Sequence, residues 1–185
     1  LYGTEESHGY LAGQHVRDKD GGAAALLLCE LAARLKVQGQ TLHEKLDALF
    51  WQHGVHQERT VSVQMPGSEG MARMKDVMTS CRCTPPQKVA GIDVVQIRDY
   101  LNQQTLFPGQ EPGPLEGPRG DLVIIDLAEE GNYIAVRPSG TEPKIKLYMF
   151  AYTPPEQLAN LDNAKETLIG RLDQVEADLR AFAGV

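Results

Sequence analysis

The residues with the clearest chemical potential lie between Arg137 and Lys146, where the chain reads Arg-Pro-Ser-Gly-Thr-Glu-Pro-Lys-Ile-Lys. Arg137 carries a planar guanidinium whose donors match the oxygens of a phosphate group. Gly140 can adopt a positive φ, which would let consecutive backbone N–H groups point at one anion, and the hydroxyls of Ser139 and Thr141 would add donors. We therefore expect an anion-binding turn here, although a Ser-Gly-Thr triplet alone is more often a solvated β-turn.

Charged side chains after the tip of this turn add to the expected site. Lys144 and Lys146 are two residues apart on an expected strand, so their side chains share one face of it. Glu142 is discordant, because a carboxylate beside an anion is unfavourable. We expect the Glu142 carboxylate to point away from the anion and to pair with a lysine or accept hydrogen bonds from the turn.

The first twenty residues are polar and hold a second group of candidate binding side chains. If the segment around Glu5 is extended, Glu5 and Ser7 face the same way and offer a carboxylate and a hydroxyl to a polyol. Composition alone more often indicates a solvated loop without regular secondary structure. Lys19 lies between Asp18 and Asp20, so its local sequence also allows a plain surface ion pair.

These stretches resemble motifs of the α-D-phosphohexomutases, the phosphoglucomutase/phosphomannomutase family. The ten residues from Arg137 resemble the phosphate-binding loop of the family's last domain. Residues 3–9, Gly-Thr-Glu-Glu-Ser-His-Gly, resemble the sugar-recognition loop of its third domain, and residues 15–21, His-Val-Arg-Asp-Lys-Asp-Gly, resemble the segment that follows it. The resemblance covers essentially the whole chain and implies the end of a third domain followed by a fourth domain.

The resemblance also implies a role for each candidate residue. Glu5 and Ser7 match residues that hold sugar hydroxyls, and Lys19 matches a catalytic lysine that contacts the reacting end of the substrate. The residues that would grip the phosphate that does not react are Arg137, Ser139, Gly140, Thr141 and Lys146.

In this family a phosphoserine in the first domain moves a phosphoryl group between the 1-position and the 5- or 6-hydroxyl of a sugar through a bisphosphate intermediate. The resemblance thus implies a glucose, mannose or pentose phosphate as substrate, Mg²⁺ and a sugar bisphosphate activator as cofactors, and the missing N-terminal domains as partners. The sequence holds no Ser-His-Asn nucleophile loop and no Asp-x-Asp-x-Asp metal cluster. We therefore expect a fragment that is inactive alone and binds no cofactor itself; the alternative is a free-standing phosphate-binding or regulatory module without catalysis.

Composition narrows the classes of partner. The chain has 185 residues, is 42% hydrophobic and carries a formal net charge of −7, which argues against nucleic acid or an anionic membrane as a partner. No run of about 18 apolar residues and no signal peptide is evident, so we expect a cytoplasmic protein. Cys29, Cys81 and Cys83 are an odd number without a second cluster for zinc, and are expected to be reduced thiols.

Hydrophobic periodicity predicts two helices in the N-terminal part. The run at residues 23–35 is apolar on nearly all sides, which is typical of a helix buried between layers. Thr41 and Glu44 have the spacing of a capping box, and the helix that they begin has one apolar face. We place the domain boundary between residues 57 and 58, so that residues 1–57 end the third domain and residues 58–185 form the fourth.

The remaining chain is predicted to be α+β, with an antiparallel-rich sheet covered by helices, similar to the TATA-box-binding-protein-like fourth domain of the family. Strands are expected at residues 60–65, 89–100, 122–127, 133–136 and 145–152. Apolar spacing predicts a methionine-lined helix from Met71 to Cys81 and a long terminal helix after Pro155. The proline- and glycine-rich residues 108–120 are expected to form an irregular loop.

The two N-terminal helices form a helical hairpin that, by the resemblance, belongs on a third-domain sheet. No strand run precedes Asp20, so we expect that sheet to be lacking from this chain. Exposed apolar helix faces tend to find a partner, and we therefore expect self-association through the hairpin.

Overall fold

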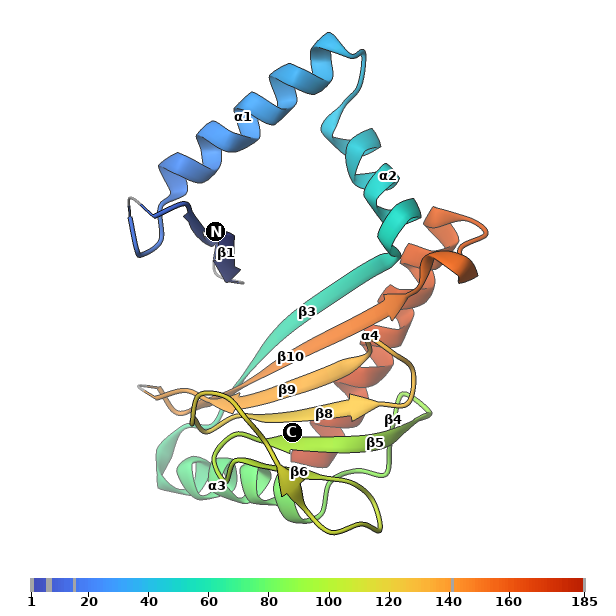
Figure 1. Ribbon diagram of the computed structural model, residues 1–185. Helices are drawn as coiled ribbons and strands as arrows, with labels where there is room; N and C mark the ends of the chain where they lie inside the picture. The colour runs from blue at the N-terminus through green and yellow to red at the C-terminus, as the bar shows by residue number, and fades with distance from the viewer. Residues whose placement is uncertain (1, 6–7, 15, 141, 185) are drawn as a thin grey trace. The chain divides into compact units, whose positions relative to one another are not determined.

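The computed structural model of the chain describes residues 2–5, 8–14, 16–140 and 142–184. The chain divides into two compact units, residues 1–53 and 54–185, which we call the N-terminal and C-terminal units (Figure 1). The expected boundary after residue 57 falls inside a strand of the C-terminal unit that begins at Val55.

The N-terminal unit begins with a β-hairpin. Strand β1 (Tyr2–Glu5) pairs antiparallel with β2 (Gly9–Ala12), and Glu5 lies opposite Gly9. The expectation of an irregular segment without strands before Asp20 is therefore wrong. Each strand has four residues with little apolar alternation, so hydrophobic periodicity could not reveal it.

Side-chain caps begin both helices of this unit. Asp20 caps α1 (Gly21–Val37) by accepting a hydrogen bond from a backbone N–H in its first turn at 3.0 Å. Helix α2 (Leu42–His53) begins at the predicted capping box: the Glu44 carboxylate accepts from the Thr41 N–H at 2.7 Å, and the Thr41 hydroxyl accepts from the Glu44 N–H at 3.2 Å.

The apolar side chains of α1 and α2 are largely exposed. Among their described residues only Leu35 is buried, whereas 70% of Leu26 is exposed. The other exposed large apolar residues are Leu27, Leu28, Leu31, Val37, Leu42, Leu46, Leu49 and Trp51. Burial of the first helix between layers is thus wrong for this chain, because β1 and β2 are too short to cover two helices of 17 and 12 residues.

The C-terminal unit is built on an antiparallel sheet with the strand order β3-β10-β9-β8-β5-β6-β7 (Figure 1). The strands are β3 (Val55–Gln64), β4 (Lys88–Val89), β5 (Ile92–Asp99), β6 (Gln104–Leu106), β7 (Gly113–Pro114), β8 (Val123–Leu127), β9 (Tyr133–Pro138) and β10 (Lys144–Thr153). Pairing of β8 with β9 and of β9 with β10 confirms the predicted hairpin and third strand. These pairings place the turn between β9 and β10 at one end of the sheet.

Two departures from the predicted elements have local causes. The strand expected over residues 89–100 is two strands, β4 and β5, because Ala90 and Gly91 adopt φ values of 50° and 76° and form a tight turn. The terminal helix does not begin at Pro155. A 3₁₀ turn, Pro155–Gln157, comes first, and α4 (Leu161–Ala183) begins where the Asn160 side chain accepts from a backbone N–H.

Helices α3 (Gly67–Cys83) and α4 cover one face of this sheet (Figure 1). The residues that α4 buries on its apolar face include Leu161, Leu168, Leu172, Val175 and Leu179, as predicted. In α3 the methionine stripe is core filler at Met74 and Met78, while Met71 is exposed. Burial raises the pKa of the adjacent Cys81 thiol to about 12, so this thiol stays protonated.

The opposite face of the sheet, which we call the open face, carries the polar and aromatic side chains. Strand β10 shows the alternation: Ile145, Leu147, Met149 and Ala151 are buried on the helix side, and Lys144, Lys146, Tyr148 and Phe150 are half-buried on the open face. The register pairs Lys146 with Arg137 of β9, which therefore also lies on the open face.

Candidate functional site

Backbone and side-chain hydrogen bonds close the turn between β9 and β10. The Ser139 N–H donates to the Lys144 carbonyl at 2.9 Å, and the Lys144 N–H donates to the Glu142 carbonyl at 2.8 Å. The Ser139 hydroxyl oxygen accepts from the Glu142 N–H at 3.3 Å. Ser139 therefore helps to shape the turn as well as to line its surface.

Glu142 behaves as its sequence context predicts. Its carboxylate accepts from the Lys144 ammonium at 2.7 Å, which confirms that it pairs with a lysine. The pair places a carboxylate next to Lys144 and reduces the positive charge that this lysine can offer an anion. The other cationic groups beside the turn are those of Arg137 and Lys146.

Gly140 contributes space to the turn. A positive φ was expected there, but the backbone of Gly140 does not adopt the left-handed conformation, so that expectation is wrong. A Cβ added at Gly140 would meet no atom within 4 Å. The tip is consequently open on the side where a side chain would stand, and a ligand can approach the Gly140 backbone closely.

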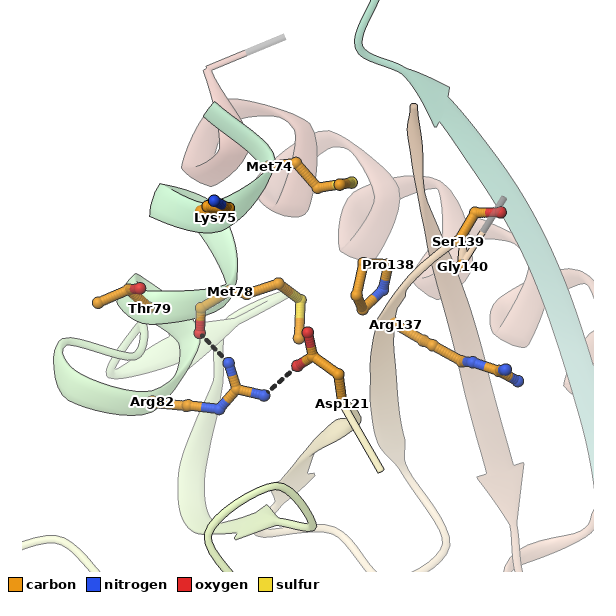
Figure 2. Close-up of a pocket in the computed structure, with 10 residues that line it drawn as sticks. All are labelled: Met74, Lys75, Met78, Thr79, Arg82, Asp121, Arg137, Pro138, Ser139 and Gly140. Carbon is orange, nitrogen blue, oxygen red and sulfur yellow. Dashed lines mark hydrogen bonds and ion pairs between the residues drawn. The ribbon is translucent and has the colours of Figure 1, made fainter. Parts of the chain in front are cut away.

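Arg137 and Lys146 lie directly opposite each other on neighbouring strands. Like charges in this arrangement repel, and a bound dianion would offset the repulsion. Arg137 is exposed, and Figure 2 shows its guanidinium on the far side of β9 from α3. The structure thus brings two of the predicted cations together on the open face.

A cavity of about 570 Å³ lies on the other side of β9, between the turn and α3 (Figure 2). Its lining residues are Met74, Lys75, Met78, Thr79, Arg82, Asp121, Arg137, Pro138, Ser139 and Gly140. The turn backbone at Ser139 and Gly140 is therefore reachable from the helix side, whereas the Arg137 guanidinium is directed away from the cavity. Because a guanidinium is well matched to the oxygens of an oxyanion, the candidate anion site is on the open face and not in this cavity.

Arg82, which lines this cavity, forms a buried ion pair with Asp99 that was not foreseen from the sequence. The Asp99 side chain is fully buried and accepts from the Arg82 Nε at 3.0 Å, from the Asn102 amide at 2.6 Å and from the Leu101 N–H at 3.0 Å. Arg82 also pairs with Asp121. Burial alone would raise the pKa of Asp99, but these hydrogen bonds outweigh burial and hold its pKa below the ordinary value.

The N-terminal unit brings two predicted residues into one small cavity of about 230 Å³. The Lys19 ammonium lies 3.9 Å from the Glu5 carboxylate and 3.3 Å from the Asp18 carboxylate. Hydrogen bonds and charge from Lys19 lower the pKa of Asp18, so the expected ion pair with Asp18 is present. Asp20, the other expected partner, instead caps α1.

Gly9 is a residue of this cavity whose importance was missed. A Cβ at Gly9 would stand 2.4 Å from a Lys19 carbon and 2.5 Å from a Glu5 oxygen. Only glycine therefore allows the Glu5 and Lys19 side chains to approach each other in this way. The sequence signal is the glycine four residues after Glu5, but nothing local shows which side chains cross over it.

Two predicted site residues, Ser7 and Thr141, lie outside the residues that the structure describes. Within the described ranges, no three histidine, cysteine, aspartate or glutamate side chains gather as a metal site requires. The described part of the chain also contains no helix that combines the length and the apolar character needed to cross a bilayer.

Two family models match the chain. The model described as "Phosphoglucomutase/phosphomannomutase, alpha/beta/alpha domain III" matches residues 1–53, and the one described as "Phosphoglucomutase/phosphomannomutase, C-terminal domain" matches residues 78–166. The first match has the same limits as the N-terminal unit, and the second lies within the C-terminal unit.

Curated relatives agree with these models. A phosphoglucomutase of Staphylococcus aureus strain MRSA252 is 36% identical over 155 residues, which are 83% of this chain and 28% of the relative. The corresponding protein of strain MSSA476 is 36% identical over 150 residues. The chain thus spans less than a third of the length of these relatives.

A solved structure shares the fold. The open form of the exocytosis-sensitive phosphoprotein pp63/parafusin, a phosphoglucomutase from Paramecium, matches 97% of this chain and 30% of its own, with a TM-score of 0.55 and 20% sequence identity. At this level of identity the match concerns the fold alone.

Proposed function

This chain belongs to the phosphoglucomutase/phosphomannomutase family, and on that premise we propose that it is the sugar-recognition and phosphate-binding part of a sugar-phosphate mutase. The complete enzyme would move a phosphoryl group between the 1-position and the 5- or 6-hydroxyl of a glucose, mannose or pentose phosphate. The C-terminal unit would grip the phosphate that does not react in each half-reaction.

The observation that carries this proposal is the pair of cations on the open face. Arg137 and Lys146 face each other across β9 and β10 beside the open tip at Gly140. A phosphate dianion between them would accept a bidentate pair of bonds from the guanidinium and one from the ammonium. Ser139 and Thr141 would add hydroxyl or backbone donors, which completes the set expected from the motif.

For the N-terminal unit we propose contact with the sugar and its reacting end. Glu5 and Ser7 would accept and donate hydrogen bonds to sugar hydroxyls. The Lys19 ammonium lies within 4 Å of the Glu5 and Asp18 carboxylates. A charged Lys19 would stabilise the negative charge on the oxygen that gains or loses the phosphoryl group.

Of the two cofactors implied for the complete enzyme, we propose that this chain would bind the sugar bisphosphate and not the Mg²⁺. In this proposal the Mg²⁺ of the complete enzyme is held by residues outside this chain; among the described residues no three histidine, cysteine, aspartate or glutamate side chains gather as a metal site requires. A bisphosphate would place one phosphate on Arg137 and Lys146 in the same way as the substrate does. The role of this chain is therefore to position the substrate, which is the main task of the protein in phosphoryl transfer.

Titration of the isotope-labelled chain with inorganic phosphate and with glucose 6-phosphate, followed by NMR, tests the proposal. We expect amide shifts at residues 137–146, and weaker binding in Arg137→Ala. Lys75→Ala is the matched control, because Lys75 lines the cavity on the helix side. If Lys75→Ala weakens binding and Arg137→Ala does not, the phosphate occupies that cavity and the open-face site is wrong.

We also propose that the chain alone self-associates through α1 and α2. Their exposed leucines would gain roughly 1.5 to 3 kcal/mol for each side chain that becomes fully buried. Light scattering should give a molar mass that rises above 20.3 kDa with concentration, and Leu27→Glu combined with Leu31→Glu should return it to the monomer. A monodisperse wild-type monomer at millimolar concentration would contradict this proposal.

A further inference from the structure

Lys146 packs against an aromatic ring on the open face. Its ammonium nitrogen lies 5.7 Å from the centroid of the Tyr148 ring, within the range of about 6 Å in which the negative face of a ring attracts a cation. Lys146 pairs with Arg137 across the strands, and Tyr148 pairs with Ala135 at the next position on the same face. The ring therefore lies next to the two cations of the candidate phosphate site.

We propose that Tyr148 is a positioning residue that holds the Lys146 ammonium beside Arg137, ready for the anion. The inference rests on the proposed function, because it concerns the same bound phosphate. Repulsion from Arg137 favours rotamers of the flexible lysine side chain that point away from the guanidinium. The attraction to the Tyr148 ring opposes that repulsion, so fewer conformations of Lys146 are lost when phosphate binds.

The neighbouring side chains support a fixed open face. At the next position along the strands, the rings of Tyr133 and Phe150 are stacked with centroids 4.4 Å apart and an interplanar angle of 17°. Arg98 lies over Tyr133 at 5.9 Å and donates two hydrogen bonds to Asp126, at 2.7 and 2.8 Å. Tyr148 thus lies between an ordered aromatic cluster and the cation pair.

The chemistry of the contact predicts which part of Tyr148 matters. The cation is attracted by the face of the ring, so the phenolic hydroxyl is dispensable and phenylalanine should replace tyrosine. Leucine fills a similar apolar space without a π-system. Tyr148→Phe and Tyr148→Leu therefore separate positioning through the ring from simple packing, and Phe150→Leu is a control that removes an aromatic ring from the next position on the same strand face.

Two measurements on the full 185-residue chain test the inference. Without phosphate, NMR signals of the Lys146 side-chain methylenes should show a ring-current shift that persists in Tyr148→Phe and disappears in Tyr148→Leu. With inorganic phosphate as the probe, Tyr148→Leu should raise Kd about two- to five-fold, the range of an exposed cation–π contact, while Tyr148→Phe and Phe150→Leu stay close to wild type.

Measuring the effect of Tyr148→Leu on phosphate affinity in a Lys146→Met variant distinguishes an error in the role of Tyr148 from an error in the phosphate site. If Tyr148 acts through Lys146, Tyr148→Leu should have no further effect on phosphate affinity once Lys146 is methionine. An equal loss in both backgrounds, or an unchanged ring-current signal in Tyr148→Leu, would overturn the positioning role. Phosphate affinity that is insensitive to both Arg137→Ala and Lys146→Met would instead overturn the phosphate site itself.

Discussion

Arg137→Ala in the complete enzyme should lower kcat/KM by a factor that corresponds to about 1.5 to 3 kcal/mol, the usual strength of hydrogen bonds to a charged group. The guanidinium is exposed and lies opposite Lys146, so its removal leaves the fold intact and takes away one of two cations from the phosphate. Steady-state kinetics with glucose 1-phosphate would measure the loss. Most of it should appear in KM, because a phosphate that does not react is bound similarly in the ground and transition states.

A matched control is Arg180→Ala, which removes an arginine that pairs with Glu176 on α4. This variant should keep kcat/KM near wild type. Lys19→Met offers the opposite contrast, since we propose that Lys19 acts at the reacting end and therefore affects kcat. An Arg137→Ala enzyme with unchanged kcat/KM would show that the guanidinium does not hold the substrate.

The sequence predicted the C-terminal unit well where the signal was local. Apolar and β-branched runs separated by turn-forming residues identified β8, β9 and β10, and the helical spacing of Leu168, Leu172 and Val175 identified the buried face of α4. The shortest elements were not predicted. The four-residue strands β1 and β2 and the turn at Ala90 carry too few apolar positions for periodicity to act on, and tertiary pairing decides their conformation.

For the candidate site, the motif indicated which residues could bind an anion, but it did not show how their side chains are arranged. The pairing of Glu142 with Lys144 followed from charge alone. The opposition of Arg137 and Lys146 depends on the register of β9 against β10, which the turn length sets and the residue types do not show. The link between Arg82 and Asp99 joins a helix to a strand 17 residues later, and no local pattern identifies such partners.

The largest effect on stability is expected at Asp99, whose carboxylate is fully buried against Arg82. Asp99→Ala would leave the Arg82 side chain, which is only 11% exposed, with one carboxylate fewer and would remove the acceptor for three amide donors. Breaking one side of a buried pair costs about 3 to 5 kcal/mol of unfolding free energy. Urea denaturation followed by circular dichroism would measure it, with Asp121→Asn as the control at the exposed end of the same arginine, where less than about 1 kcal/mol is expected.

A second variant, Asp99→Asn, tests whether the stability that Asp99 contributes is electrostatic, because that contribution should then depend on pH. The folded-state pKa of Asp99 is below its unfolded value of about 3.9, so the carboxylate stabilises the fold fully above that value. The contribution is lost as the pH falls through the folded-state pKa. The difference in unfolding free energy between wild type and Asp99→Asn should therefore be constant between pH 7 and 5 and shrink below about pH 4. A difference that persists unchanged in acid would show that packing, and not the charge of Asp99, holds Arg82 at the cavity wall.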